Sequence, residues 1–129
     1  MRQLCLSIAL LLAFGAIACS RGDFDVQAIT GVTLIDGTPQ PPVSQANVVV
    51  QRGRIVAAGP AASVPVPPDA TRTDGGGLFV FPLDPLVPIR VGADANLLLL
   101  KVNPAVEPDY LKHVAGRMKI GRWTLDPRR

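Results

Sequence analysis

The stretch at residues 48–59 constrains the fold of this chain most strongly. It contains two apolar runs, 48–50 (VVV) and 55–58 (IVAA), which are joined by the polar segment 51–54 (QRGR). β-Branched residues favour strands, and Gly53 can supply the positive φ that a tight hairpin needs, either in a two-residue loop or at the αL position of a bulged one. Because an isolated hairpin is marginal in water, the rest of the chain must supply further strands.

The composition indicates one small, mainly β domain. The chain has 129 residues, of which 48% are hydrophobic and 18% charged, and its 13 prolines and 12 glycines separate short Val/Ile/Leu runs. This pattern of short apolar runs between turn residues is typical of β proteins. The net charge of +3 is small and dispersed, so we expect no nucleic-acid partner.

The N-terminus has the layout of an export signal. Arg2 precedes an apolar run at 4–17, and Cys19 follows small residues. Residues 16–19 (AIAC) resemble a bacterial lipobox, which implies removal of a signal peptide at 1–18 and lipid attachment to Cys19. Residues 19–27 would then be a lipid-anchored tether, and the protein an exported lipoprotein, anchored in a membrane on its periplasmic or extracellular side.

Two other interpretations of this segment stay open. It could be a plain secretory signal cleaved after Ala18, or a single N-terminal anchor helix, although its apolar core is shorter than the roughly 20 residues of a spanning helix. Cys5 lies inside the signal and would be removed with it. The mature chain would then have no cysteine pair and no disulfide framework.

A series of motifs in the first half of the chain resembles the N-terminal arm of the metal-dependent amidohydrolases, in the branch of imidazolonepropionases and prolidase-like enzymes. The motifs follow one another in the family's order, at residues 34–37 (LIDG), 47–50 (NVVV), 53–59 (GRIVAAG), 69–70 (DA) and 74–82 (DGGGLFVFP).

Residues 89–100 resemble the family's segment after its catalytic barrel. Gly92, Ala95 and Leu97 occupy matching places, and Asn96 stands where Asp is usual. Residues 97–100 (LLLL) predict a strand that is buried on both faces. The resemblance implies a small β-sandwich at 28–125, built from two discontinuous arms (28–82 and 89–125), with a tail at 126–129.

The sequence departs from the family between the two arms. After Pro82 the family continues with a Pro-Gly-x-x-Asp-x-His-x-His segment that opens a (β/α)8 barrel, whose histidines bind a divalent metal, usually zinc. Here only residues 83–88 (LDPLVP) lie between the arms, whereas such a barrel takes about 200–250 residues. Asp84 alone cannot hold a catalytic zinc, which needs about three protein ligands. We therefore predict no catalytic, metal or cofactor site in this chain.

The C-terminal arm carries further local signals. Residues 107–116 predict one short helix, with Pro108 at its first turn and Gly116 at its end. Residues 117–125 predict a final hairpin around Gly121, with a bulged turn because Ile120 suits positive φ poorly. His113 is expected to be a surface or packing residue. Six basic residues gather here, which predicts a solvated face or contact with anionic lipid: Lys112, Arg117, Lys119, Arg122, Arg128 and Arg129.

Three hypotheses of function follow. The chain is an internally deleted member of the amidohydrolase family that does not hydrolyse substrate by itself. Alternatively, it is a membrane-tethered β-sandwich module for binding a partner. A third possibility is that the sequence is a fragmentary version of an intact amidohydrolase, a hydrolase of C–N bonds. In the family the sandwich packs against the barrel, so the face left by the missing barrel predicts a homo-oligomer or a protein partner.

Overall fold

The computed structural model describes residues 25–128, and within that range the chain is mainly β, as predicted. The predicted signal peptide, Cys19, most of the predicted tether and Arg129 lie outside the described residues. The strands are β1 (Val26–Leu34), β2 (Val43–Gln51), β3 (Arg54–Pro60), β4 (Thr71–Asp74), β5 (Phe79–Pro82), β6 (Leu97–Leu100), β7 (Val114–Lys119) and β8 (Arg122–Leu125).

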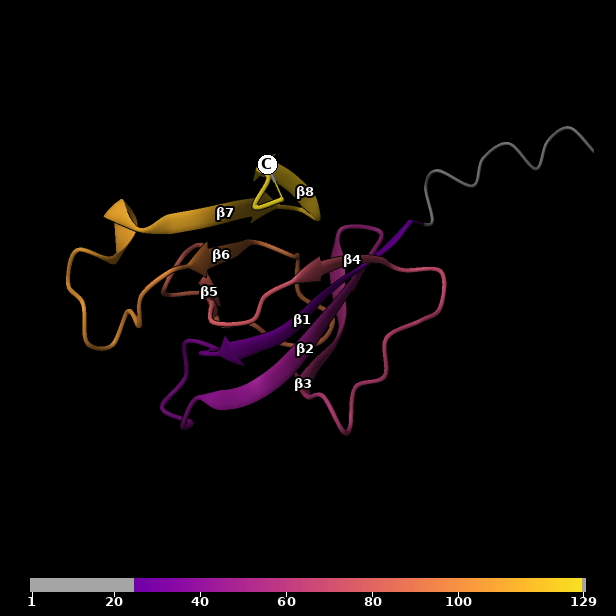
Figure 1. Ribbon diagram of the computed structural model, residues 1–129, viewed down its shortest axis with the longest axis horizontal. Coiled ribbons are helices and arrows are strands. Elements are labelled where there is room, and N and C mark those ends of the chain that lie inside the picture. The colour runs from indigo at the N-terminus through magenta and orange to yellow at the C-terminus, as the bar shows by residue number, and fades with distance from the viewer. Residues whose placement is uncertain (1–24, 129) are drawn as a thin grey trace, which may run out of the picture.

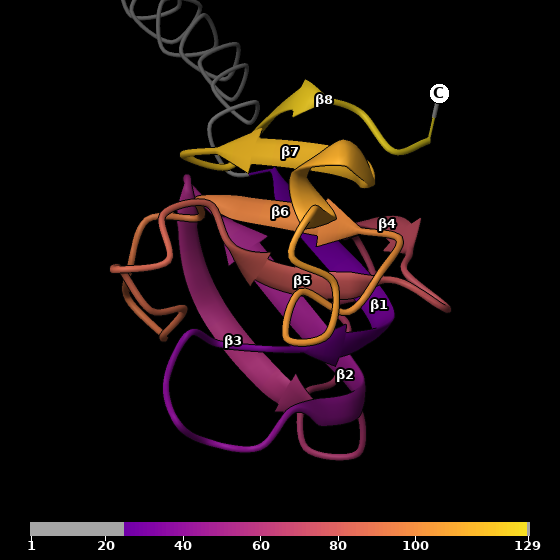
Figure 2. The ribbon, with the colours of Figure 1, turned by 90° about the vertical axis from the view of Figure 1, so that its left-hand side faces the viewer.

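All eight strands are hydrogen-bonded into one sheet in the order β3-β2-β1-β5-β6-β7-β8 (Figure 1). Strand β4 stands outside this path and pairs in parallel with the first half of β1, while β5 pairs in parallel with its end. Strands β1–β3 cross obliquely beneath β5–β7 in Figure 2. The two halves of this one bent sheet therefore enclose a core between them. The predicted β-sandwich would enclose its core in the same way, between two layers.

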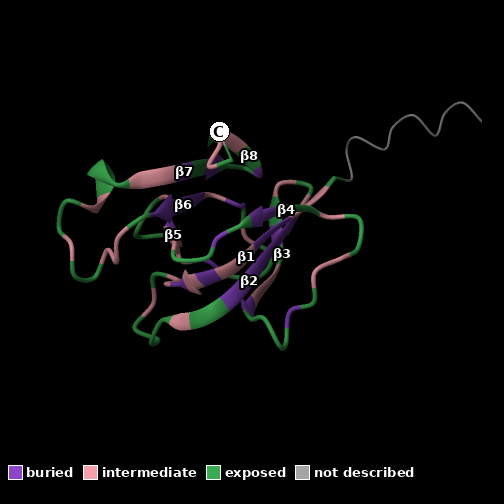
Figure 3. Cartoon of the chain, in the orientation of Figure 1, coloured by how far each residue is buried: buried purple, intermediate pink, exposed green. Residues whose placement is uncertain are grey.

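One core cluster joins residues from both arms. Ile29, Val48 and Ile55 of β1–β3 belong to the same buried cluster as Leu97 and Met118 of β6 and β7, and the buried segments run through both halves of the molecule (Figure 3). The four leucines of β6 are at most 2% exposed. The prediction that this strand is covered on both faces is therefore confirmed.

The other face of β6 is covered by aromatic residues. Leu98 pairs with Phe81 of β5, and the Phe81 ring meets Tyr110 edge to face, with the ring centroids 5.5 Å apart. Tyr110 opens a 3-10 helix at Tyr110–Lys112. The loop between β6 and β7 thus folds back over the sheet and excludes water from the second face of β6.

The segment at residues 92–96 links the two ends of the sheet. The Ile55 amide of β3 donates to the Ala93 carbonyl at 2.9 Å, and the Ala95 amide donates to the Gly53 carbonyl at 2.8 Å. On its other side, Ala95 accepts a hydrogen bond of 3.1 Å from the amide of Gly121 in the β7–β8 turn. The two hairpin turns are therefore brought to the same place.

These turns touch through their glycines. A Cβ built on Gly121 would lie 2.6 Å from the Cα of Gly53, and one built on Gly53 would lie 3.0 Å from Cγ2 of Ile120. Arg52 and Gly53 have φ of 55° and 78°, and Ile120 and Gly121 have φ of 47° and 76°. Both are two-residue turns with two positive φ angles, the type I′ arrangement that matches the strand twist.

The predicted bulged turn at Ile120 is therefore wrong. Ile120 adopts positive φ although it is β-branched, and its amide donates to Oδ1 of Asn96 at 2.8 Å. This hydrogen bond and the contact with Gly53 stabilise a conformation that the residue disfavours by itself. The bulge of this hairpin lies farther along, between Arg117 and Met118.

The predicted helix at 107–116 is shorter than expected, because only Tyr110–Lys112 is helical, as a 3-10 turn. Gly116 does not end a helix but lies in β7 opposite Leu99. Strand β6 has an edge that needs a partner, and pairing with Val114–Lys119 satisfies it. The weak helical signals do not outweigh this pairing. Gly116 is also packed closely, since a Cβ there would lie 3.0 Å from Cδ of Pro127.

Residues 75–77 join β4 to β5 without forming a hairpin. Strands β4 and β5 both run parallel to β1, so this segment connects two strands on the same edge of β1. It forms a tight turn in which the Leu78 amide donates to the Gly75 carbonyl at 2.9 Å. Gly75 is required by close approach, because a Cβ there would lie 2.1 Å from Cγ1 of Val32.

The glycine contact predicts that Gly121→Ala destabilises the fold more than Gly77→Ala. Both glycines have φ near 80°, but a Cβ on Gly77 meets nothing within 4 Å. An L-residue in this backbone region costs about 1 kcal/mol, and Gly121→Ala must also push the turns apart, which we expect to raise its loss to about 3 kcal/mol. Urea denaturation followed by Trp123 fluorescence measures both values. Equal losses would contradict a close contact between the turns.

Candidate functional site

The residues singled out from the sequence do not assemble into a catalytic group. Cys19, the predicted lipid site, lies outside the described residues. Asp84 is exposed, and its Oδ1 accepts a hydrogen bond of 2.9 Å from the Leu86 amide. His113 is exposed, as expected of a surface residue, and its carbonyl accepts a bond of 2.9 Å from Lys101. Asp84 and His113 are therefore turn residues of separate loops.

Residues 25–128 contain no group of three or more His, Cys, Asp or Glu side chains that could hold a metal ion. The donor set in this part of the chain therefore does not fit the divalent metal of the amidohydrolase resemblance. Within the same range, no helix has the length and apolar character needed to cross a membrane.

The basic residues of the C-terminal arm do not form one cluster in the structure. Lys112 lies 3.8 Å from Asp109. Arg128 donates to both oxygens of Asp126, at 2.9 and 2.7 Å, and this hydrogen bond raises the pKa of its guanidinium. Lys119 and Arg122 instead face each other across the β7–β8 turn, so these two lie together at one end of the molecule.

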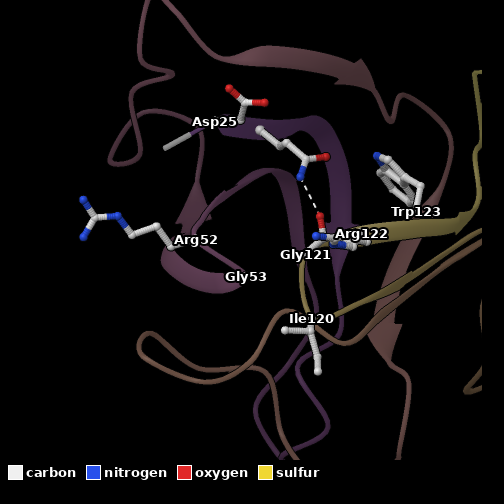
Figure 4. A pocket seen from close by; sticks show the side chains of 8 residues that line it. Asp25, Arg52, Gly53, Ile120, Gly121, Arg122 and Trp123 are labelled. Carbon is white, nitrogen blue, oxygen red and sulfur yellow. Dashed lines mark hydrogen bonds between the residues drawn. The ribbon is translucent and has the colours of Figure 1, made fainter. Parts of the chain in front are cut away.

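A hollow of about 590 Å³ opens at this end, beside the two hairpin turns (Figure 4). Three elements line it: the start of β1, the β2–β3 turn and the β7–β8 turn. The lining residues are Asp25, Gln27, Arg52, Gly53, Ile120, Gly121, Arg122 and Trp123. We call this region, together with the flanking Arg54 and Lys119, the hairpin-tip end.

Two polar side chains fix the shape of the hairpin-tip end. Nε2 of Gln27 donates to the Gly121 carbonyl at 2.6 Å, the dashed line in Figure 4. Asn96 accepts from the Ile120 amide on the other side of the same turn. The Gly121 carbonyl and the Ile120 amide are thus both bound by side chains of other elements. In this conformation the Ile120 side chain points outward and is 53% exposed.

Trp123 packs partly against the core, and its buried Nε1 has no hydrogen-bond partner among the described residues. Arg52, Arg54 and Gln27 were not recognised as site residues from the sequence. A local signal does exist, because both turns end in the same dipeptide, Gly53-Arg54 and Gly121-Arg122. The repeated dipeptide does not show that the two turns meet, because their contact depends on the tertiary structure.

A second surface feature is the connection between the arms together with the first three residues of the second arm. We call residues 83–91 the junction loop. It exposes three large apolar side chains, Leu86 at 89%, Val87 at 54% and Val91 at 63%. A small cavity of about 130 Å³ lies beside it, lined by residues that include Leu83, Val87 and Ile89. The junction loop thus gathers three of the exposed large apolar side chains of the described residues.

Comparison with known proteins gives matches only among solved structures. No family model matches the chain, and no curated protein matches it. The chain is similar to molinate hydrolase (33% identity, TM-score 0.42) and to phenylurea hydrolase B (41%, 0.42). It is also similar to N-acyl-D-glutamate deacylase from Bordetella bronchiseptica (35%, 0.37).

These three proteins are hydrolases of the amidohydrolase family. The matches cover 46%, 45% and 46% of this chain, and 13%, 13% and 12% of the respective structures. With TM-scores below 0.5, they carry no argument about what this chain does.

The hydrogen bond to Ile120 predicts different effects for two substitutions at Asn96. Asn96→Ala removes the acceptor, and we expect it to lower the free energy of unfolding by about 1 kcal/mol, the net contribution of one hydrogen bond. Asn96→Asp keeps an oxygen at that position, so its loss should be smaller. Chemical denaturation of both variants checks this order. If Asn96→Asp were the more destabilised variant, the hydrogen bond would not hold the turn.

Proposed function

We propose that this chain is a lipid-anchored β domain of amidohydrolase descent, which does not hydrolyse substrate by itself and acts by binding a second copy of the chain. One observation carries the proposal: residues 83–88 alone join the two arms, and the sheet that the arms form together contains, within residues 25–128, no group of side chains that could hold a metal ion. Strand β5 of the first arm and β6 of the second pair along their whole length, from Phe79 opposite Leu100 to Pro82 opposite Leu97.

The packing supports a self-sufficient domain. Val80 of the first arm and Leu99 of the second are paired, fully buried and members of one core cluster. Fully burying a side chain of this kind stabilises a fold by about 1.5–3 kcal/mol.

The anchor rests on the sequence. Cys19 follows small residues and an apolar run, and the six residue steps from Cys19 to Asp25 lead directly into β1. Acyl chains contribute about 0.8 kcal/mol per buried CH₂ group, so more than one chain on a single cysteine would hold the domain stably on a membrane.

The junction loop is the surface that we assign to self-association. Leu86 and Val87 lie between Asp84 and Arg90, two exposed residues of opposite charge, and Val91 follows Arg90. A two-fold contact places the same patch of both copies together. If the two loops lie antiparallel, this contact brings Asp84 of each copy near Arg90 of the other. Because each loop carries one acidic and one basic residue, a second copy is a better electrostatic match than a partner with charges of a single sign.

The anchor and the lack of hydrolysis are tested together on the full chain expressed in a bacterium with lipoprotein processing. We expect the wild type to incorporate labelled palmitate and to fractionate with membranes. Cys19→Ala should do neither, because it removes the acylated thiol. The purified wild type with added zinc should not turn over dipeptides or N-acyl amino acids. Membrane retention of Cys19→Ala without label would indicate an anchor helix, and zinc-dependent turnover would contradict the proposal of a non-catalytic domain.

Self-association is tested by sedimentation of the detergent-solubilised lipoprotein. We expect a concentration-dependent dimer that the double variant Leu86→Ser, Val87→Ser weakens by at least about tenfold, because two exposed apolar side chains lose their contacts. Leu111→Ser is the matched control, since Leu111 is 65% exposed on the 3-10 turn away from the junction loop. A wild type that stays monomeric, or an equal effect of the control, would contradict this interface.

A further inference from the structure

We propose that the hairpin-tip end docks onto the surface of the membrane in which the chain is anchored, with its basic residues on anionic phospholipid headgroups and Ile120 in the interfacial layer. This inference rests on the proposed lipid anchor at Cys19 and adds to it an orientation of the domain. Three independent features support it: the length of the tether, the charge of this end and the residue at the turn.

The tether brings the hairpin-tip end close to the bilayer. Between Cys19 and Asp25 there are six residue steps, which span at most about 20 Å when fully extended. Asp25 lines the hollow, and Val26 pairs with Gln51 just before the β2–β3 turn. A domain of about 100 residues has a radius of gyration near 13 Å and is therefore more than 30 Å across. The tether is too short to let the far end of the domain turn toward the surface.

The charge of this end suits an anionic surface. Arg52, Arg54, Lys119 and Arg122 lie on or beside the two turns, and all four are exposed. Two exposed carboxylates, Asp25 and Asp94, lie near them, so basic groups predominate. Each Lys or Arg near an anionic leaflet contributes about 1 kcal/mol of attraction.

Ile120 is the least expected residue of this end. A type I′ turn favours Asn or Gly at its first position, whereas a β-branched residue with positive φ is strained. Ile120 nevertheless has φ of 47° and is 53% exposed. Part of its side chain contacts Gly53, and the exposed part of an apolar side chain on a rigid turn gains free energy by entering the interface. Trp123, two residues beyond Gly121, lines the hollow and is half-buried, so it lies close to any lipid that this end contacts.

The experiment places the purified, lipidated full chain in vesicles of neutral phosphatidylcholine, with or without one fifth anionic phosphatidylglycerol. Trp123 is the single tryptophan of the chain, so its quenching by brominated phosphatidylcholine reports docking, and flotation of the vesicles reports the anchor. We expect quenching in the anionic vesicles that weakens in neutral vesicles and in high salt.

Two variants test the residues. Lys119→Gln with Arg122→Gln should lower the ratio of docked to undocked protein about 30-fold. Ile120→Asn should lower it about tenfold without loss of folding stability, since Asn suits the turn. Their matched controls lie at the opposite end of the β6–β7 pair: Lys101→Gln with Lys112→Gln, and Leu111→Asn, all at exposed positions. The controls should leave docking unchanged.

The possible failures are distinguishable. If the wild type floats with the vesicles but Trp123 is not quenched, or if the controls reduce docking as much as the variants, the docking surface is overturned while the anchor stands. If the wild type does not float, the anchor is overturned, and this inference with it.

Discussion

Strand β6 is the element on which the rest of the structure depends, because it holds the two arms of the chain together. It receives β5 on one edge and β7 on the other, and its leucines are buried on both faces. Without this strand the β1–β3 meander would lose one wall of its core, and the second arm would have nothing to pair with. Four consecutive leucines suit this place, since a strand covered on both sides has no face that needs polar residues.

The close contact of the two glycine turns follows from the same arrangement. Once β6 has joined the arms, residues 92–96 must run from the junction loop back to β6 beside the start of β3, and they meet both turns on the way. Only glycine leaves room where the two backbones approach. The hollow with its basic rim is therefore a product of how the sheet closes, built by segments that are far apart in the sequence.

Local pattern predicted the strands well and their arrangement only in part. The strand at 97–100 was placed correctly, because polar residues bound its four leucines on both sides. The helix at 107–116 was overestimated, since its signals were local whereas the partner of β6 is not. The parallel pairing of β4 and β5 with β1 has no local signal. The same holds for the hairpin-tip end, whose two turns could be recognised individually while their contact could not.

The place of β1 in the sheet also has a consequence for the order of folding. Its pairing with β2 and the β2–β3 hairpin join residues close in sequence, whereas its contacts with β4 and β5 close long loops. A chain that emerges N-terminus first can therefore form the β1–β3 meander early, with Ile29, Val48 and Ile55 uncovered until the second arm arrives. During that interval the half-formed domain exposes an apolar face that is prone to aggregation. Rapid synthesis of the last forty or so residues, or a chaperone that shields the meander, would shorten its exposure.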